Sequence, residues 1–323
     1  MAKIEEPITL LVSDNVWGRH ADAIRAISPG VTPIIYEGNE VLPDEIIPTI
    51  NTVFYSSDLW PDRSRGFVLS ILKATSVKWM HTFSAGVDSP FFVQLMERGI
   101  RLTNSSGATA SPIAQTTVLY MLALSRNVRA WFQHQEKHEW TRHEFAELDG
   151  ARLAVIGMGP IGIEIARLGV ALNMNVEAIR RTPNGTEPCP TFAFDQLSRV
   201  LAQADWVAVA LPLTDDTRQI FNAETFAIMK PGAHFINVGR GELVDEDALI
   251  AALQSGHLAG AALDVFATEP LPPDSPLWNM DNVIITPHSS SASAQSGLRS
   301  EDIFVKNFAR YVAGEPLINE VNL

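Results

Sequence analysis

The stretch from Arg152 to Gly162 constrains the fold of this chain more than any other. It is a short apolar run, Leu153 to Ile156, followed by Gly-Met-Gly-Pro-Ile-Gly, a G-x-G-x-x-G pattern. Apolar residues then recur at helical spacing over 161–172, and a second apolar run covers 176–179. Strand, glycines, helix and strand in this order are typical of a dinucleotide-binding unit. A glycine-rich turn that only connects a strand to a helix is the disfavoured alternative.

Each glycine of this turn has its own expected task. Gly157 permits the tight turn, Gly159 lets the backbone approach a pyrophosphate, and Gly162 lets the helix pack closely on the strand. Pro160 and Ile161 open the helix, whose N-terminus attracts phosphate charge. We therefore expect these five residues to bind the cofactor.

The end of the second strand indicates which dinucleotide is bound. An acidic residue about 20 positions after the glycines usually binds the adenosine ribose of NAD, whereas an arginine accommodates the 2′-phosphate of NADP. Arg180 and Arg181 stand at this place, and Glu177 lies three residues too early. The sequence thus predicts a preference for NADP(H), with NAD(H) as the alternative. Two ordinary solvated charges at a strand end are the other interpretation.

Composition excludes several classes of partner. The 323 residues carry a net charge of −13, which argues against a nucleic-acid or membrane surface. The single cysteine, Cys189, cannot form an intrachain disulfide, and no Cys/His cluster has metal-ligand spacing. The N-terminus lacks the pattern of a secretory signal, and no apolar run reaches the roughly 18 residues of a membrane span. We expect a cytoplasmic, metal-free protein.

The pattern of elements predicts an α/β protein with two doubly wound parallel sheets. The first hundred residues suggest strands at 8–12, 32–36, 52–55 and 77–82, and helices at 17–27, 63–74 and 90–98. A long helical stretch, about 111–140, leads to six strands at 153–156, 176–179, 206–211, 234–238, 259–265 and 283–286, with helices at 224–229 and 245–255 between the later ones. Such alternation is typical of a parallel sheet covered by helices.

The last helix, about 293–313, and the tail, 316–323, have no strand left to pair with in the second sheet. We expect them to return to the first one. This gives a discontinuous substrate-binding domain, 1–105 with 290–323, of the flavodoxin-like type. The dinucleotide-binding domain, 106–289, is then inserted in it.

Two further segments attract attention. Ser84, Ala85, Gly86 and Val87 directly follow a strand, where free backbone amides suit an anion such as a carboxylate; a plain turn is the alternative. The aromatic residues of the long helical stretch, Trp131, Phe132 and Trp140, suggest a pocket cap or a subunit contact, although packing is the commoner role of such residues.

Three polar groups follow late strands, at the edge where ligands bind in such sheets. Arg240, Glu269 and His288 suit hydride chemistry on a 2-oxo acid. The arginine would hold the carboxylate and polarise the carbonyl, and the histidine would donate the proton. The glutamate would keep the imidazole charged. Each residue has a bland alternative as a surface or loop side chain, and their recurrence at successive strand ends argues against it.

These motifs together resemble the D-isomer-specific 2-hydroxyacid dehydrogenases over nearly the whole chain. The matching segments are 84–88, 157–162, 211–217, 235–245, 262–270 and 285–288. The resemblance implies that Arg240, Glu269 and His288 are catalytic and that Ser84 to Val87, with Arg240, take the substrate carboxylate. It assigns to the cofactor Leu211, Pro212, Thr217, Val238, Gly239 and Asp264, the last through the nicotinamide amide. It also implies a homodimer joined through the nucleotide domains.

Three departures from the family pattern refine this expectation. Gln115 replaces a common Glu, Ser291 replaces a common Gly, and Arg180 replaces the acidic ribose contact. Arg180 resembles the glyoxylate/hydroxypyruvate reductase branch, so we expect NADPH-dependent reduction of a small 2-oxo acid. Glu269 argues against the related formate dehydrogenases, which carry Gln there. A dinucleotide-sensing protein like the corepressors of this fold, or an NAD-linked biosynthetic dehydrogenase, remains the alternative.

Overall fold

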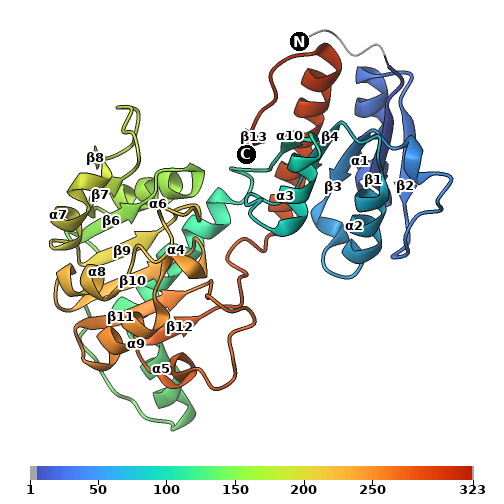
Figure 1. Ribbon diagram of the computed structural model, residues 1–323. Coiled ribbons are helices and arrows are strands. Elements are labelled where there is room, and N and C mark those ends of the chain that lie inside the picture. Colours follow the sequence, from blue (N-terminus) through green and yellow to red (C-terminus); the bar gives the residue numbers. More distant parts are fainter. Residues whose placement is uncertain (1–5, 322–323) are drawn as a thin grey trace. The chain divides into compact units, whose positions relative to one another are not determined.

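A computed structural model describes residues 6–321, and within them the chain forms two compact units (Figure 1). The chain passes from the first unit to the second at Thr109/Ala110 and returns at Ala292/Ser293. The limits expected from the sequence, 105/106 and 289/290, lie four and three residues earlier. The parts of those expectations that concern residues 1–5 and 322–323 lie outside the described residues.

The first unit is built on a six-stranded sheet in the order β13-β5-β4-β3-β1-β2. Its strands are β1 (Thr9–Ser13), β2 (Thr32–Tyr36), β3 (Thr52–Tyr55), β4 (Trp79–Thr82), β5 (Arg101–Thr103) and β13 (Glu320–Val321). Its helices are α1 (Asp14–Ile27), α2 (Ser64–Lys73), α3 (Pro90–Glu97) and α10 (Ala294–Ala313). Apolar side chains alternate along the buried strands, so Leu11 and Tyr55 face the core under α2 and α3, whereas Leu10 and Phe54 face the core under α1 and α10.

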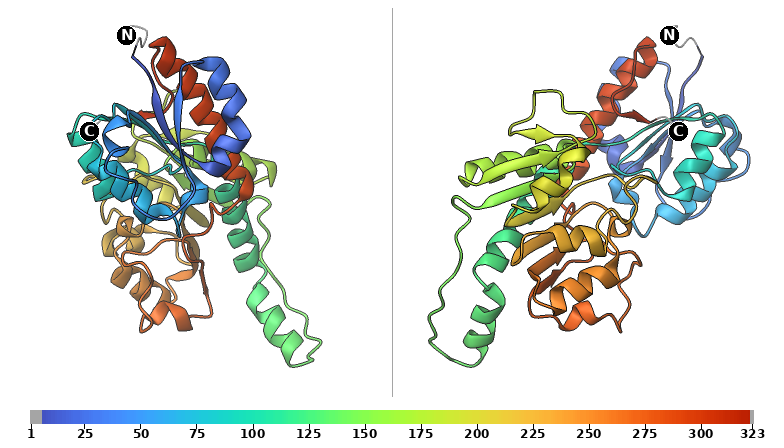
Figure 2. Two further views of the ribbon diagram at one scale, coloured as in Figure 1. Left: turned by 90° about the vertical axis from the view of Figure 1, so that its right-hand side faces the viewer. Right: turned by 60° about the vertical axis from the view of Figure 1, so that its left-hand side comes forward.

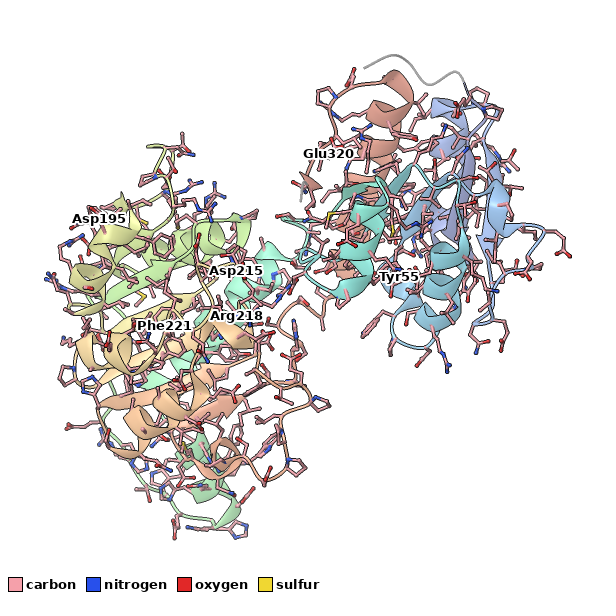
Figure 3. All side chains as sticks on the ribbon, viewed as in Figure 1. Tyr55, Asp195, Asp215, Arg218, Phe221 and Glu320 are labelled. Carbon is pink, nitrogen blue, oxygen red and sulfur yellow. The ribbon has the colours of Figure 1, made fainter. Side chains whose placement is uncertain are left out.

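The C-terminal part of the chain completes this unit. The Phe304 ring on α10 stacks on Phe54 with centroids 4.3 Å apart, and α10 lies beside α1 (Figure 2). Glu320 on β13, labelled in Figure 3, pairs with Arg101 through N–O contacts of 2.6 and 3.0 Å. Strand β13 is antiparallel to β5, and the other strands run parallel. The expected insertion of one doubly wound unit in another is confirmed.

The second unit holds a parallel sheet of seven strands in the order β12-β11-β10-β9-β6-β7-β8. They are β6 (Arg152–Ile156), β7 (Asn175–Ile179), β8 (Thr191–Phe192), β9 (Trp206–Val209), β10 (Ala233–Asn237), β11 (Leu258–Leu263) and β12 (Val283–Ile285). Helices α4 (Ala110–Ser125) and α6 (Pro160–Ala171) cover one face, and α7 (Leu197–Leu201), α8 (Ala223–Ile228) and α9 (Glu246–Gln254) cover the other. The sequence predicted six of these strands. Strand β8 is a two-residue edge strand, too short for an apolar pattern to show it.

The long helix expected over 111–140 is wrong in two respects, because the structure breaks it near Asn127 and ends its second part at Glu136. Asn127 has φ of +49°, a left-handed conformation that ends α4, and α5 (Val128–Glu136) begins after it. None of the nine α5 residues is buried. Helix α5 and the segment that returns from it extend away from the rest of the second unit (Figure 2). We call residues 128–147 the arm.

Candidate functional site

The loops that follow the strands of the second unit lie in one row. Parallel strands carry their carboxyl ends to the same edge of the sheet, and three glycines bring the neighbouring loops into contact. A Cβ on Gly157 would lie 2.6 Å from the Ala210 carbonyl oxygen, and one on Gly239 would lie 2.9 Å from that of Leu211. A Cβ on Gly241 would lie 1.8 Å from the Phe266 carbonyl carbon. The loops after β6, β9, β10 and β11 therefore form one continuous surface.

The glycine turn leaves an open place at the start of α6. Gly157 has φ of +106°, and its N–H donates to the Ile179 carbonyl, which ties the turn to β7. A Cβ on Gly162 would lie 1.8 Å from the Gly157 oxygen, so helix and turn are in direct contact. A Cβ on Gly159 would meet no atom within 4 Å. No side chain caps α6, which begins at Pro160 and Ile161, so its N-terminus fits a phosphate group.

Arg180 follows β7 and forms an ion pair that the sequence did not suggest. Its Nη1 lies 2.7 Å from Oε1 of Glu187, whose side chain is only 3% exposed. The same carboxylate accepts hydrogen bonds from the N–H groups of Asn184 and Gly185, at 3.0 and 2.8 Å. These amides, Asn184 first, and Arg180 hold the pKa of Glu187 at about 2. Arg181 is exposed.

The loop after β9 is shaped from within by a threonine. Thr217 is buried, its hydroxyl donates to the Pro212 carbonyl at 2.8 Å, and it accepts from the Thr214 N–H at 2.8 Å. Leu211 is also buried. Asp215 and Arg218 lie on the same loop (Figure 3). Leu211, Pro212 and Thr217 were predicted to contact the cofactor. In the structure Leu211 and Thr217 are buried and shape the loop on which Pro212 lies.

The loop after β10 is folded around a buried amide. The Asn237 side chain donates to the Arg240 carbonyl at 2.8 Å and accepts from the Gly239 N–H at 3.0 Å. Val238, which lies between Asn237 and Gly239 in the sequence, is buried. The Arg240 guanidinium donates from Nη1 to the Gly239 carbonyl at 2.9 Å. The sequence places Asn237 at the start of the polar segment that carries Arg240, but it does not indicate this role in the loop.

Asp264, at the end of β11, is the centre of the turn that carries His288. Its buried carboxylate accepts hydrogen bonds from the Thr286 hydroxyl at 2.6 Å and from the Ser289 N–H at 2.9 Å. The N–H and the hydroxyl of Ser290 donate to it as well. Because Thr286 donates to Asp264, the Tyr120 hydroxyl donates to Thr286; burial raises the pKa of Tyr120 to about 12. The carboxylate therefore fixes the turn from 286 to 290.

His288 and Glu269 meet at the end of this row. The Nδ1 atom of His288 lies 2.8 Å from Oε2 of Glu269, and both side chains are partly exposed. The His288 N–H donates to the Asp264 carbonyl at 2.8 Å, and its φ of +50° is one that few non-glycine residues adopt. Glu269 also accepts from the Phe266 N–H at 3.1 Å. With Nδ1 donating to the carboxylate, Nε2 is the ring nitrogen that can exchange a proton with a ligand.

The predicted carboxylate-binding turn lies in the first unit, after β4. The Ser84 hydroxyl donates to the Gly86 carbonyl at 2.7 Å, and the Asn104 side chain donates to the Ala85 carbonyl at 2.8 Å. Within residues 6–321, the N–H groups of Ala85, Gly86 and Val87 donate no hydrogen bond. Three neighbouring amides of this kind can donate hydrogen bonds to an anion.

Two negative findings concern the described part of the chain only. It contains no group of three or more His, Cys, Asp or Glu side chains that could hold a metal ion. His134 instead contacts Glu139, with Nδ1 2.6 Å from Oε2. None of the helices in residues 6–321 has the length and apolar character needed to cross a membrane.

Known proteins match both the sequence and the fold. Residues 118–290 match the model of the D-isomer specific 2-hydroxyacid dehydrogenase, NAD binding domain. Glyoxylate/hydroxypyruvate reductase B of Salmonella schwarzengrund is 36% identical over 258 residues, 77% of this chain and 79% of that protein.

Two crystal structures cover 98% of this chain. A D-isomer specific 2-hydroxyacid dehydrogenase family protein from Aeromonas salmonicida matches with a TM-score of 0.83 at 30% identity, over 99% of its length. A D-isomer specific 2-hydroxyacid dehydrogenase from Xanthobacter autotrophicus, in complex with NADPH and MES, matches with a TM-score of 0.78 at 32% identity, over 98% of its length.

Proposed function

The chain belongs to the D-isomer-specific 2-hydroxyacid dehydrogenase family, and we propose that it reduces a small 2-oxo acid, such as glyoxylate or hydroxypyruvate, with NADPH. The family match confirms the resemblance seen in the sequence, and it confirms that the protein is an oxidoreductase of this class. The observation that carries the proposal is the 2.8 Å contact between His288 and Glu269, in the same unit as the open glycine turn.

The three polar side chains divide the chemistry between them. His288 donates the proton to the substrate oxygen from Nε2, because Nδ1 is engaged by Glu269. The Glu269 carboxylate keeps the ring oriented through its contact with Nδ1. Arg240 binds the substrate carboxylate and polarises the carbonyl, as a guanidinium can. When bound, the nicotinamide cofactor supplies the hydride.

The proposed cofactor contacts begin at the open place beside Gly159, at the start of α6. Gly159 leaves room for the pyrophosphate beside the α6 N-terminus, and Arg180 with Arg181 would contact the 2′-phosphate of NADP(H). The Pro212 and Gly239 loops would flank the bound dinucleotide, and Asp264 would meet the nicotinamide amide. The NADPH complex of the Xanthobacter protein supports the choice of cofactor. The amides of Ala85 to Val87 offer donors of the kind that a substrate carboxylate needs.

We also propose a homodimer in which the second copy covers the arm. Trp140 is 99% exposed and Phe132 is 61% exposed, and Trp131 and Phe145 are exposed as well. Aromatic groups of this size are enriched in subunit contacts. Wild-type protein should run as a dimer in light scattering, and the variant Trp140→Ser/Phe132→Ser should be a folded monomer. A monomeric wild-type protein would contradict the proposal.

Initial rates test the proposed reaction. We expect turnover of glyoxylate or hydroxypyruvate with NADPH to exceed that with NADH, and the ranking against a bulkier 2-oxo acid gives the size of the pocket. Arg180→Asp should remove the preference for NADPH. If NADH is preferred, the role of Arg180 is wrong. If the protein binds NADPH but reduces no 2-oxo acid, the sensor function is the better description.

A further inference from the structure

We propose that Glu187 positions Arg180 for the 2′-phosphate of NADP(H) and so contributes to the choice of cofactor. This inference rests on the proposed function, since it concerns the same site. The inference goes beyond the proposed function, in which Arg180 alone distinguishes NADP(H) from NAD(H).

The carboxylate of Glu187 organises the loop between β7 and β8. Asn184, Gly185 and Thr186 are all exposed, yet the Glu187 side chain is only 3% exposed. It accepts the N–H groups of Asn184 and Gly185, and the Asn184 side chain accepts the N–H of Thr186 at 3.0 Å. A covered acceptor inside an exposed turn holds that turn in one conformation. The loop is therefore built around Glu187.

The same carboxylate fixes the direction of the Arg180 side chain. The Arg180 backbone N–H donates to the Phe192 carbonyl at 3.0 Å, so the residue is anchored where the β7–β8 pairing ends. A guanidinium on a flexible stem loses rotamer freedom when it binds a phosphate. The 2.7 Å contact with Glu187 removes much of that freedom beforehand. The guanidinium is planar and carries five donors, so a contact at Nη1 orients the whole group.

The negative charge of Glu187 opposes a phosphate, and its surroundings weaken this effect. Two peptide N–H groups and one guanidinium share the carboxylate, so its charge is locally compensated. Arg181 follows Arg180 in the chain, is exposed and carries a further positive charge. We therefore expect the gain from orientation to exceed the repulsion.

Binding measurements separate the two effects. The probes are 2′,5′-ADP, which carries the 2′-phosphate, and 5′-AMP, which lacks it, both titrated calorimetrically into wild type, Glu187→Gln, Arg180→Ala and the double variant. Glu187→Gln should weaken binding of 2′,5′-ADP about tenfold, equivalent to roughly 1.4 kcal/mol. Binding of 5′-AMP should not change. The double variant should bind 2′,5′-ADP no more weakly than Arg180→Ala alone, because Glu187 acts through Arg180.

A matched control is available on strand β7, which directly precedes Arg180. Glu177 on β7 contacts Arg199 at 3.4 Å, so Glu177→Gln removes an equal charge from another Glu–Arg pair. It should leave both ligands bound as in wild type. Unchanged 5′-AMP binding and thermal unfolding would show that Glu187→Gln is folded, and Glu187→Asp, which keeps the charge, should recover part of the lost affinity.

The outcomes distinguish this inference from the proposed function. Tighter or unchanged binding of 2′,5′-ADP by Glu187→Gln, with weaker binding by Arg180→Ala, overturns the positioning role alone. Equal losses for both ligands would also overturn it, because the carboxylate would then only support the fold. If Arg180→Ala binds 2′,5′-ADP as wild type does, the contact between Arg180 and the 2′-phosphate is itself wrong.

Discussion

At the scale of single residues, the glycines of the 157–162 turn divide between packing and access. Gly162 touches the backbone of Gly157, and no room remains there for a methyl group. Gly159 faces open space and has φ of −74°, which any residue can adopt. Two identical substitutions only three residues apart should therefore have opposite effects on stability and on binding.

The prediction for this pair is direct. Gly162→Ala should lower the unfolding free energy by about 1–3 kcal/mol, because the backbone must shift to admit the Cβ. Gly159→Ala should leave it unchanged or raise it by about 0.4–1 kcal/mol, since alanine restricts the unfolded chain. Only Gly159→Ala should weaken NADPH binding in folded protein, by about tenfold. Thermal unfolding and NADPH titration test the effects on stability and on binding. Normal NADPH binding by Gly159→Ala would show that the pyrophosphate does not lie beside Gly159.

A second prediction concerns the His288–Glu269 pair. Glu269→Gln keeps the size of the side chain and replaces the carboxylate that accepts from Nδ1 of His288 by a neutral amide. A charge-assisted hydrogen bond is stronger than a neutral one, so the ring should be held less firmly in the variant. We expect kcat for 2-oxo acid reduction to fall at least about tenfold, while NADPH binding stays as in wild type. Steady-state rates and a parallel binding titration test this, and an unchanged kcat would mean that Glu269 does not position His288.

At the scale of elements, the turn from Thr286 to Ser290 shows how a fold can hold a reactive side chain in an unfavourable conformation. His288 adopts φ of +50°, and the residues on both sides of it are tied to the Asp264 carboxylate. Strand β11 thus holds the turn that follows β12. The strained backbone of His288 is sustained by these hydrogen bonds.

Loosening that turn should lower the rate more than it lowers cofactor affinity. Ser290→Ala removes one hydroxyl donor and should lower stability by about 1 kcal/mol. Asp264→Ala leaves several buried donors unpaired and should lower it by at least about 2 kcal/mol. In Ser290→Ala we expect kcat to fall while the KM for NADPH stays near the wild-type value. A change in that KM alone would indicate that Ser290 acts on the cofactor and not on His288.

The sequence predicted elements well where periodic apolar residues decide the structure. All six strands expected in the second unit are present, because each buries an apolar run. It failed where one residue or a few contacts decide. Asn127 interrupts a pattern that continues to look helical, and β8 has only two residues. At the site, the sequence indicated the row of polar side chains. Glu187 was not predicted, and Asn237 was given no role of its own, because both act through contacts across a loop, which have no periodicity.

At the scale of the whole molecule, each unit contains a histidine that burial keeps neutral. Burial lowers the pKa of His81, in the first unit, to about 3, and that of His234, in the second, to about 4. In an unfolded chain both histidines would have a pKa of about 6.5. Below that pH the unfolded state binds more protons, so stability must fall as the pH falls from about 6.5 towards the folded-state values.

The dependence of the unfolding free energy on pH can be measured. Each histidine should lower the unfolding free energy by about 1.4 kcal/mol per pH unit between roughly pH 6 and 5. His234 stacks on Trp206 with centroids 4.1 Å apart, and phenylalanine can keep that contact. His234→Phe should therefore fold normally and show a shallower loss of stability with acid, in denaturant titrations of the second unit. An unchanged slope would mean that His234 is not the group responsible.

The return of the chain to the first unit has a consequence for synthesis on the ribosome. Phe304, Phe308 and Tyr311 of α10 fill the core around Phe54 and Trp79, and they are made only after the 183 residues of 110–292. At about 5–20 residues per second this delay is roughly 10–40 s. During that time one face of the nascent N-terminal sheet is covered by α1 alone and its aromatic residues lack the α10 side chains, whereas the inserted unit has all its strands and can fold first. The unit that begins the chain is thus the last to be completed.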